Sequence, residues 1–481
     1  MATSDVIHTA SRIGLRSNGS HTLPPIYSLP YELLAQIMLL AMLPPAREHR
    51  PYPVASWLFV LCHVCSLWRQ VAFNTPRLWT IDTFPIYLRG NLEEEENAVD
   101  YFPSSAASAM FLQHSTLLPI RVYLFQSREM YTKLTVDSMA KLLSAAPRWQ
   151  TLEIVWAAGW EEFNSKDLAR MPPVILASLE DLILQSVGPE MWQDQLDIFL
   201  SAPRLRRVTF EGKDIPPLPW SQLTRLSLNH DSPQPCLDII VHCVNIIHLS
   251  VTTKQWAHLA DPNSYASATS GLLPRLEVLD MRLGLWSSGD HLNPFLETLK
   301  LPALKSLSLA LRPPYGEDNS SVSWLTPSLL SFLAHCPDLK QLTVDNCDSC
   351  IYSEDVPVIL QRTPNLTKLS FVESELDDDF FTILTYEPRQ PESALVPHLE
   401  TLELFEVGDQ FSEESLIEMV KSRWWADEEQ SEKHATPGVV RLKHLAVLNY
   451  VARQNLDVVD FTPQLRDVLA VYQNQGLDVK I

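Results

Sequence analysis

The sequence Leu223-Thr224-Arg225-Leu226-Ser227-Leu228 carries apolar side chains at its first, fourth and sixth positions. The same leucine-x-x-leucine-x-leucine pattern, with conservative apolar replacements, recurs in eleven copies along the chain. The copies occupy residues 149–154, 179–184, 205–210, 223–228, 246–251, 276–281, 304–309, 339–344, 366–371, 399–404 and 442–447. Most copies begin 23 to 35 residues after the previous one. Recurrence at this period indicates a stack of similar structural units.

The second half of each copy alternates apolar and polar residues, which is the pattern of a strand with one buried face. Several copies follow an apolar stretch of helical character that stops at a proline, such as Pro203, Pro337 and Pro364. Proline cannot continue a helix, so each unit reads as helix, proline and strand. One strand cannot bury its leucines alone, whereas stacked units share a continuous core. The pattern resembles leucine-rich-repeat proteins and predicts a curved α/β solenoid over residues 120–481, with a parallel sheet on its concave side.

The segment 23–83 predicts a small all-α module. Pro30 suits the first turn of a helix, because its missing N–H needs no partner there, and apolar residues follow it as far as Ala41. A second apolar stretch from Trp57 to Val71 also has helical spacing. A module of about 60 residues cannot bury two broadly apolar helices within itself. The surplus apolar surface must therefore face either the repeats or another protein.

The module contains three short motifs in a fixed order. They are Leu29-Pro30-x-Glu32-Leu33-Leu34-x-x-Ile37, then Val64-Cys65-x-x-Trp68-Arg69-x-Val71-Ala72, then Pro76-x-Leu78-Trp79. Together they resemble the F-box, in the looser form found in fungal proteins that combine an F-box with leucine-rich repeats. The segment 44–53 departs from a compact F-box, because it is longer and richer in proline. The resemblance implies a substrate receptor of a Skp–cullin–F-box ubiquitin ligase, whose module binds the Skp adaptor, and through it a cullin, while the solenoid binds an unknown target protein.

The resemblance also implies which residues contact the Skp adaptor. They are Leu29, Pro30, Leu33, Leu34, Ile37, Val64, Cys65, Trp68 and Arg69. The first five precede the proline-rich segment 44–53 and the other four follow it. For each of them the alternative is a packing role within the module.

The exposed face of the predicted sheet is the candidate surface for the target protein. Its central column is predicted to contain Glu153, Ile183, Thr209, Ser227, Ser250, Asp280, Ser308, Thr343, Ser370, Glu403 and Ala446. We predict partner contacts for Arg207, Thr209, Arg225, Ser227, His248, Ser250, Asp280, Arg282, Gln341 and Thr343. One hypothesis is that Arg207, Arg225 and Arg282 form a patch for an acidic or phosphorylated segment. The alternative is scattered surface charge.

Composition and motifs weigh against several other functions. The formal net charge is −21, and such a surface repels phosphate backbones, so no nucleic-acid partner is expected. The sequence contains no glycine-rich phosphate loop, no GxSxG and no HExxH. The CxxC pairs Cys62/Cys65 and Cys347/Cys350 lie in different predicted domains, which favours structural roles over a shared zinc site. We therefore expect no enzyme activity, cofactor or metal.

The remaining segments complete the expected organisation. We expect a flexible tail over 1–22, a bridging segment over 84–119 with a helix at 106–115, a loop over 423–437, a helix over 463–475 and a last strand over 477–481. The sequence shows no apolar leader and no stretch of membrane length, so we expect an intracellular protein of the cytoplasm or nucleus without a membrane partner. Two other functions stay open: an interaction scaffold without a ligase role, and an enzyme whose site spans several repeats.

Overall fold

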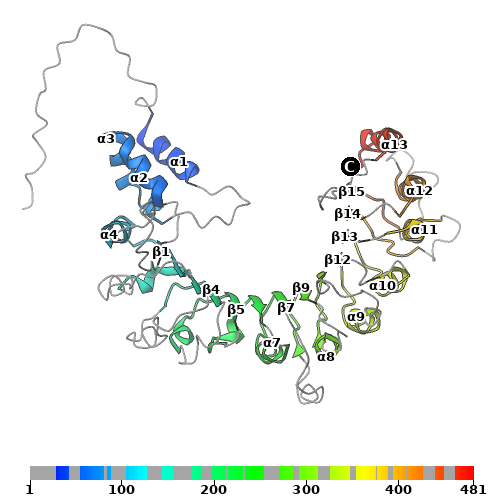
Figure 1. The fold of residues 1–481 in the computed structure, drawn as a ribbon, viewed down its shortest axis with the longest axis horizontal. Coiled ribbons are helices and arrows are strands. Elements are labelled where there is room, and N and C mark those ends of the chain that lie inside the picture. Colours follow the sequence, from blue (N-terminus) through cyan, green and yellow to red (C-terminus); the bar gives the residue numbers. More distant parts are fainter. Residues whose placement is uncertain are drawn as a thin grey trace, which may run out of the picture. The chain divides into compact units, whose positions relative to one another are not determined.

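The apolar repeats form one parallel sheet in the computed structural model of the chain (Figure 1). Among the residues that the structure describes, fourteen strands pair in this sheet. In the order in which they lie side by side, they are β1 Phe84–Tyr87, β2 Ile120–Gln126, β3 Trp149–Trp156, β4 Asp181–Ser186, β5 Arg207–Glu211, β6 Arg225–Asn229, β7 His248–Thr253, β9 Val278–Gly284, β11 Ser306–Arg312, β12 Gln341–Asn346, β13 Lys368–Val372, β14 Thr401–Phe405, β15 His444–Leu448 and β16 Asp478–Lys480. A separate parallel pair joins β8 Gly271–Leu272 to β10 Leu299–Lys300.

The chain divides into two units. The first unit comprises Met1–Asp82 and Ala106–Leu118, and the second unit comprises Thr83–Ser105 and Pro119–Ile481. The structure describes residues 29–42, 55–80, 84–87, 105–115, 117–126, 144–156, 176–186, 197–212, 215–230, 233–253, 271–284, 292–312, 325–346, 351, 354–374, 376–387, 394–407, 410–425, 439–448 and 461–481. The expected tail at 1–22, the proline-rich segment 44–53 and the pair Cys347/Cys350 lie outside these ranges. The expected bridging segment is shared between the units, because β1 joins the sheet and most of α4 (Ser105–His114) belongs to the first unit.

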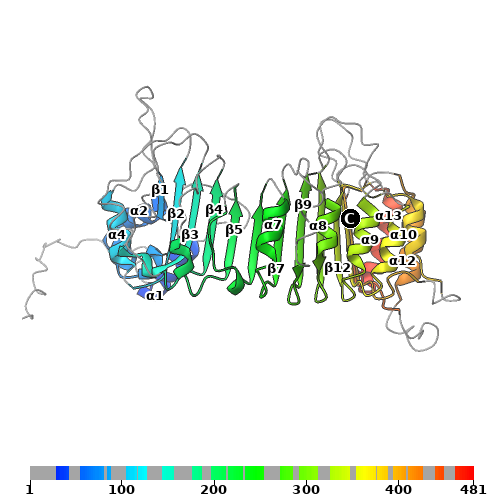
Figure 2. The same ribbon diagram turned by 90° about the horizontal axis from the view of Figure 1, so that it is seen from below.

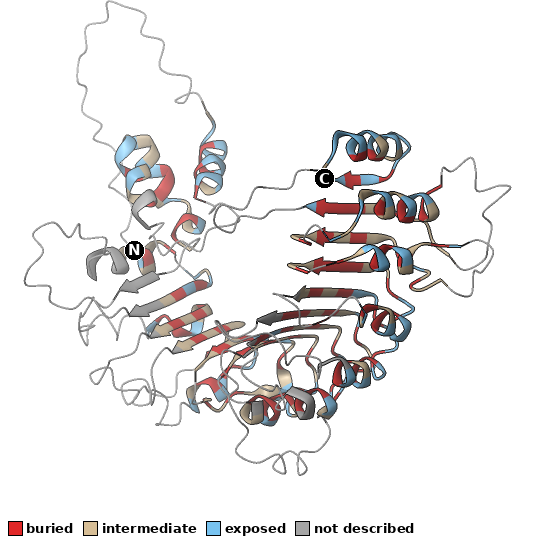
Figure 3. Cartoon of the chain, turned by 45° about the vertical axis from the view of Figure 1, so that its right-hand side comes forward, coloured by how far each residue is buried: buried red, intermediate tan, exposed pale blue. Residues whose placement is uncertain are grey.

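Strands such as β5, β6 and β14 bury alternate side chains, whereas β13 and β15 also bury the small residue between, Ser370 or Ala446. In β6, Leu226 and Leu228 are fully buried, whereas Ser227 between them is only half-buried. Neighbouring strands are in register, so that Leu226 pairs with Val208 on one side and with Leu249 on the other. The apolar side chains therefore stack into two continuous rows, and the alternation is visible along the strands in Figure 3. All eleven predicted copies supply residues to these rows, which confirms the prediction.

Helices cover the buried face of the sheet. In the second unit they are α7 Pro233–Ile240, α8 Leu292–Thr298, α9 Leu325–Leu333, α10 Val356–Arg362, α11 Asp378–Leu384, α12 Glu413–Arg423 and α13 Pro463–Asn474. Figures 1 and 2 show the strands along the inner side of the second unit and these helices along its outer side. Fully buried side chains such as Phe295 and Phe332 reach from the helices into the core. The second unit is thus a curved α/β leucine-rich-repeat solenoid with a parallel concave sheet, as the sequence predicts.

The predicted stop at proline is seen after α9 and α10, whereas the turn before β5 differs. Pro337 follows α9 and Pro364 follows α10, in each case a few residues before the next strand. Before β5, however, Pro203 follows a 3-10 helix, Asp197–Ser201, rather than an α-helix. Short 3-10 turns also precede β3 and β6, at Ala146–Arg148 and Trp220–Gln222.

A repeated backbone hydrogen bond fixes the register at the starts of the strands. The carbonyl of Arg206 accepts the N–H groups of Thr224 at 2.9 Å and Arg225 at 3.0 Å. The carbonyl of Thr224 then accepts those of Ile247 at 2.8 Å and His248 at 3.1 Å. The same shared acceptor recurs at every strand of the sheet from β5 to β15. Because each turn is bonded to the next, a strand cannot slip by one residue without breaking this series.

A fully buried arginine, Arg423, ends α12. Its guanidinium donates hydrogen bonds to three backbone carbonyl groups. These belong to Leu384, Leu395 and Val396. Burial lowers the pKa of Arg423 to about 10, which leaves the group charged at neutral pH. The prediction of a loop beginning at residue 423 is therefore wrong at its start: Arg423 is helical, and Trp424 and Trp425 behind it are buried.

Side-chain hydrogen bonds join the first turns of the last three helices. The Asp378 carboxylate accepts the backbone N–H of Ser412 at 2.7 Å and the hydroxyl of Ser415 at 2.6 Å. Glu413 in turn accepts the N–H of Thr462 at 2.7 Å. Ser412 and Thr462 are the N-caps of α12 and α13. An acidic residue in the first turn of one helix thus holds the cap of the next, and the hydrogen bonds from Ser415 and Ser412 lower the pKa of Asp378.

The first unit is a small helical bundle around Trp79. Its elements are α1 Tyr31–Ala41, α2 Ala55–Val64, α3 Ser66–Phe73, a 3-10 helix Pro76–Trp79, and α4. Trp79 is fully buried, and its indole N–H donates to the carbonyl of Ala72 at 2.8 Å. The rings of Phe73, Phe111 and His114 lie 5.6, 5.2 and 4.7 Å from it, centroid to centroid. The helix expected at 106–115 therefore packs in this unit, through Phe111 and His114.

Phe371 of β13 and Phe405 of β14 are a matched pair on the two faces of the sheet. Phe371 is 4% exposed and faces the core, whereas Phe405 is half-buried on the other face. We expect Phe371→Ala to lower the free energy of unfolding by about 3–5 kcal/mol, because it leaves a cavity. Phe405→Ala should lower it by less than about 1.5 kcal/mol. Urea denaturation followed by circular dichroism measures both, and equal losses would contradict the assignment of the two faces.

The hydrogen bonds of Asp378 predict a pH dependence of stability. The pKa of Asp378 in the folded chain lies below its unfolded value, so its contribution is present above the unfolded pKa and disappears as the pH falls through the folded pKa. We expect Asp378→Ala to lower the melting temperature at neutral pH and to flatten the acid side of the curve below about pH 4. Asp379→Ala, a substitution of the neighbouring exposed carboxylate, is the control and should change neither property. If the melting temperatures of the two variants depended on pH in the same way, the stabilising role of the Asp378 hydrogen bonds would be contradicted.

Candidate functional site

Helix α1 carries apolar side chains on two faces. Leu34 and Met38 are fully buried in the core of the first unit. Leu33, Ile37 and Leu40 are 47%, 44% and 68% exposed. Their spacing of four and three residues places them on one face of the helix. A helix that packs one apolar face in its own unit and leaves a second one in water offers that second face to a partner.

Helix α2 adds two exposed valines, Val60 and Val64, each 55% exposed and four residues apart. We call Leu33, Ile37, Leu40, Val60 and Val64 the exposed apolar set. Sequence reasoning missed Leu40 and Val60 in this set. The continued spacing of three to four residues after Leu33 and Ile37 was the signal for Leu40, but Val60 lies within an apolar run whose buried and exposed sides the sequence does not distinguish.

The first group of predicted adaptor contacts is divided by the structure. Pro30 is exposed and Leu29 is half-buried, and the Pro30 carbonyl accepts the N–H groups of Leu33 and Leu34, each at 3.1 Å. Pro30 is therefore the N-cap of α1 rather than its first helical residue. Leu33 and Ile37 are accessible to a partner. Leu34 differs from the expectation, because its fully buried side chain belongs to the core of the unit.

The second group lies at the junction of α2 and α3. Cys65 is the N-cap of α3, and its sulfur accepts the N–H of Trp68 at 3.5 Å. Arg69 is exposed, and its Nε donates to the carbonyl of Cys62 at 2.9 Å. Trp68 is half-buried, and Val64 is the most accessible apolar member of the group. Cys65 and Arg69 thus also shape the junction that positions Val64.

The predicted central column forms a single row across the concave face. All eleven of its residues, from Glu153 to Ala446, are register partners of their neighbours. The row continues through Tyr123 to Pro85 at one end and to Lys480 at the other. The middle of the row is hydroxylated except at Asp280, and its residues are Thr209, Ser227, Ser250, Asp280, Ser308, Thr343 and Ser370. Small hydroxyl groups leave the backbone of the sheet close to any bound partner.

The structure does not bring the three arginines of the predicted patch together. Arg207, Arg225, His248 and Gln341 lie in one row, on the side where the strands begin. Arg282 lies in another row, in register with Thr252. The two rows are four residues apart along the strands, or about 13 Å. Arg207 and Arg225 are therefore neighbours, and Arg282 is separate from both.

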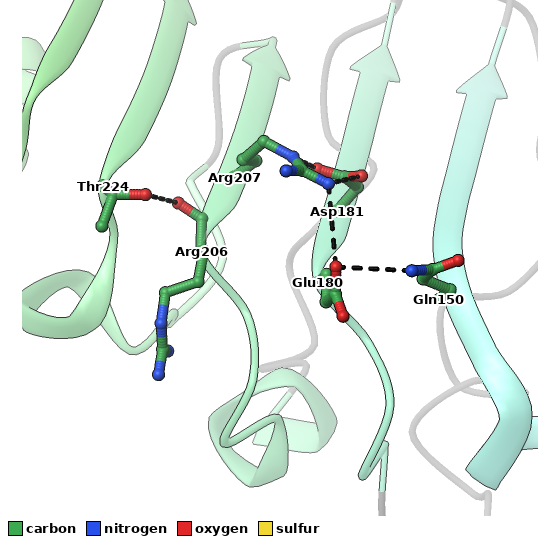
Figure 4. A network of polar contacts seen from close by, with 6 residues as sticks. All are labelled: Gln150, Glu180, Asp181, Arg206, Arg207 and Thr224. Carbon is green, nitrogen blue, oxygen red and sulfur yellow. Dashed lines mark hydrogen bonds and ion pairs between the residues drawn. The ribbon is translucent and has the colours of Figure 1, made fainter. Parts of the chain in front are cut away.

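Arg207 is also neutralised by its own neighbours. Its guanidinium forms a two-pronged contact with the carboxylate of Asp181 on β4, and Glu180 lies 3.9 Å away (Figure 4). The hydrogen bond to Asp181 raises the pKa of Arg207 above its ordinary value. Arg206 points away from this network and donates to the carbonyl of Leu205 at 2.9 Å. A partner that used Arg207 would have to compete with Asp181 for it.

The last strands carry a second network of paired charges. The Lys368 ammonium lies 2.8 Å from Glu403, and His444 Nδ1 lies 2.7 Å from Asp478. Nε2 of the same histidine is 4.0 Å from Glu403. His444 of β15 therefore lies between the carboxylates of Glu403 on β14 and Asp478 on β16. Charges in this part of the face therefore hold neighbouring strands together.

The described residues offer little for chemistry. Burial raises the pKa of Cys236, Cys243 and Cys336 to about 12, which keeps them as unreactive thiols. In the described part of the chain, no group of three His, Cys, Asp or Glu side chains is placed to hold a metal ion. A shallow hollow of about 280 Å³ lies at the turns before the late strands. It is lined by Asp338, Lys340, Asn365, Thr367, His398, Glu400 and Val440, and the Glu400 carboxylate is already paired with Lys443 at 2.7 Å.

In the described ranges, none of the helices combines the length and the apolar character needed to span a bilayer.

Comparisons with known proteins add a distant likeness. No family model matches the chain, and no curated protein matches it. The leucine-rich-repeat-containing protein LegL7 of Legionella pneumophila is similar over 56% of this chain and 86% of its own, at 17% identity and a TM-score of 0.32. A protein of Bacteroides fragilis covers 61% of this chain and 73% of its own, at 16% identity and a TM-score of 0.26. The TLR13–ssRNA13 complex covers 70% of this chain, which spans 44% of that structure's chain, at 14% identity and a TM-score of 0.31. The assignment of the fold rests on the strand register and the buried rows described above.

Proposed function

We propose that the chain is a non-catalytic adaptor. The first unit binds a Skp-type adaptor, and through it a cullin, and the concave sheet binds a target protein that is thereby presented for ubiquitin ligation. The single observation that carries this proposal is the second apolar face of α1, formed by Leu33, Ile37 and Leu40. Ligation of this kind takes place in the cytoplasm and nucleus, where we place the protein.

The energetics of the exposed apolar set favour a partner. Covering a large aliphatic side chain contributes about 1.5–3 kcal/mol relative to leaving it in water. Leu33, Ile37 and Val64 belong both to this set and to the motifs that resemble the F-box. Three of the five residues of the set are thus residues that would dock a Skp-type adaptor. Trp68 and Arg69 flank them and fit the rim of such an interface.

The concave sheet suits a protein partner better than a small molecule. A small-molecule site is usually a deep apolar cavity with a few converging polar groups. The described part of this face is instead a broad surface with a row of hydroxyl groups, flanked by longer side chains such as Arg225 and Gln341. Such a surface matches an extended or convex segment of another protein. The same features support a scaffold without a ligase role, which remains the second candidate if the first unit binds no Skp-type adaptor.

Binding of the purified full chain to a purified Skp-type adaptor, measured by titration calorimetry, tests the proposal. Val64 and Val471 are a matched pair, because both are helical valines and are 55% and 54% exposed. We expect Val64→Asp to weaken adaptor binding by about 30-fold, as for a typical interface hot spot. Val471→Asp on α13 should leave it unchanged.

Two further results complete the test. Ile37→Asp should weaken binding as Val64→Asp does, because both side chains belong to the exposed apolar set. Both variants should keep the circular dichroism spectrum and melting temperature of the unaltered chain, since neither side chain is buried. If the unaltered chain does not bind the adaptor, or if Val471→Asp is as damaging as Val64→Asp, the ligase role is rejected and the scaffold role takes its place.

A further inference from the structure

Three charges in the middle of the concave face have no partner among the residues that the structure describes. Arg207 is held by Asp181, and Lys368 by Glu403. By contrast, the side chains of Arg225, Asp280 and Arg282 form neither a hydrogen bond nor an ion pair in the described part of the chain. Both arginines are exposed and Asp280 is half-buried.

The register of β6, β7 and β9 places these charges on a regular grid. Arg225 lies at one corner, on β6 in the row of strand starts, and Arg282 lies at the opposite corner, on β9. The two corners are two strand spacings and four residues apart, which is about 16 Å along the diagonal. Ser250 on β7 lies at the centre of that diagonal, and Asp280 lies beside it on β9. The floor between the two arginines is thus a small hydroxyl group that lets a peptide backbone come close.

We propose that this grid binds an extended acidic segment of the target protein, with one carboxylate at Arg225 and a second at Arg282. Two residues four positions apart in an extended chain point to the same side and span about 13 Å. The two long arginine side chains can bridge the difference between this span and the diagonal of about 16 Å between the corners. The proposal deepens the function proposed above, because it names the kind of segment that the concave sheet takes from its target.

The charge pattern distinguishes this segment from a phosphorylated one. Each corner holds a single guanidinium without a partner among the described residues, because Arg207 beside Arg225 is held by Asp181. One guanidinium matches a carboxylate in a two-pronged contact, whereas phosphate groups are usually bound by clusters of arginines. Asp280 repels an acidic residue in the middle of the segment and accepts a hydrogen bond from a hydroxyl or N–H group there. Two spaced acidic residues with small polar residues between them therefore fit better than a continuous acidic run.

The test uses the purified full chain and capped glycine–serine peptides that differ only in the spacing of two glutamates. Fluorescence anisotropy at low ionic strength should give the tightest binding at a spacing of four and weaker binding for an uninterrupted glutamate run. Arg225→Glu and Arg282→Glu should each weaken the best peptide by roughly tenfold. The double variant should instead prefer the same peptide with lysines in place of glutamates.

Arg121→Glu is the matched control. Arg121 is an exposed arginine of β2 in the same row as Arg225, outside the grid, and its reversal changes the net charge equally. It should leave peptide binding unchanged, and every variant should still bind the Skp-type adaptor, which separates this proposal from the function on which it rests. The proposal is overturned if no glutamate peptide binds, if spacing has no effect, if Arg121→Glu weakens binding equally, or if phosphoserine peptides bind more tightly than glutamate peptides.

Discussion

Side chains alternate between the two faces of a β-strand, so one short apolar motif determines both what this chain buries and what it leaves for partners. Leu226 and Leu228 enter the core, and Arg225 and Ser227 must then face outward. Shared carbonyl acceptors at the strand starts carry the same phase from β5 to β15. A slip of one residue in any repeat would expose its leucines and bury its polar residues, so the concave surface is as strongly determined as the core behind it.

Several charges on that surface join neighbouring strands. Arg207 and Asp181 join β4 to β5, and Lys368 and Glu403 join β13 to β14. Cross-strand pairs of this kind contribute modestly to stability. A partner that binds one of the paired groups must compete with the other. In a chain with a formal net charge of −21, the two arginines of the grid, which have no partner in the described ranges, are therefore a local exception. Helices α1 and α2 of the first unit carry the exposed apolar set, and the concave face of the second unit carries mostly polar side chains.

The repeat pattern was enough to predict the solenoid, the eleven central strands and the whole central row, because periodicity and burial impose the same phase on every copy. It did not predict that Arg207 is already neutralised, since Asp181 lies 26 positions earlier in the chain and only the packing of adjacent repeats brings the two together. It also placed Arg282 in one patch with Arg225, although the rows that contain them lie four residues apart along the strands. Leu33 and Leu34 were both expected to contact the adaptor. Consecutive residues of a helix point in different directions, so Leu34 is buried while Leu33 is exposed. Arg423 was expected in a loop, because a charged residue beside two tryptophans gives no sign of the carbonyl groups that it satisfies.

The most direct test of the account is hydrogen–deuterium exchange of the full chain, with mass spectrometry, alone and with a Skp-type adaptor. When the adaptor binds, we expect slower exchange in peptides that cover α1 and α2, which carry the exposed apolar set. We expect no change in the strands from β5 to β15. Protection that appears on the strands while α1 and α2 exchange as before would contradict it, because the adaptor would then occupy the surface assigned to the target. Unchanged exchange throughout the chain would also contradict the ligase role, and an interaction scaffold that binds partners through its concave sheet would then be the favoured function.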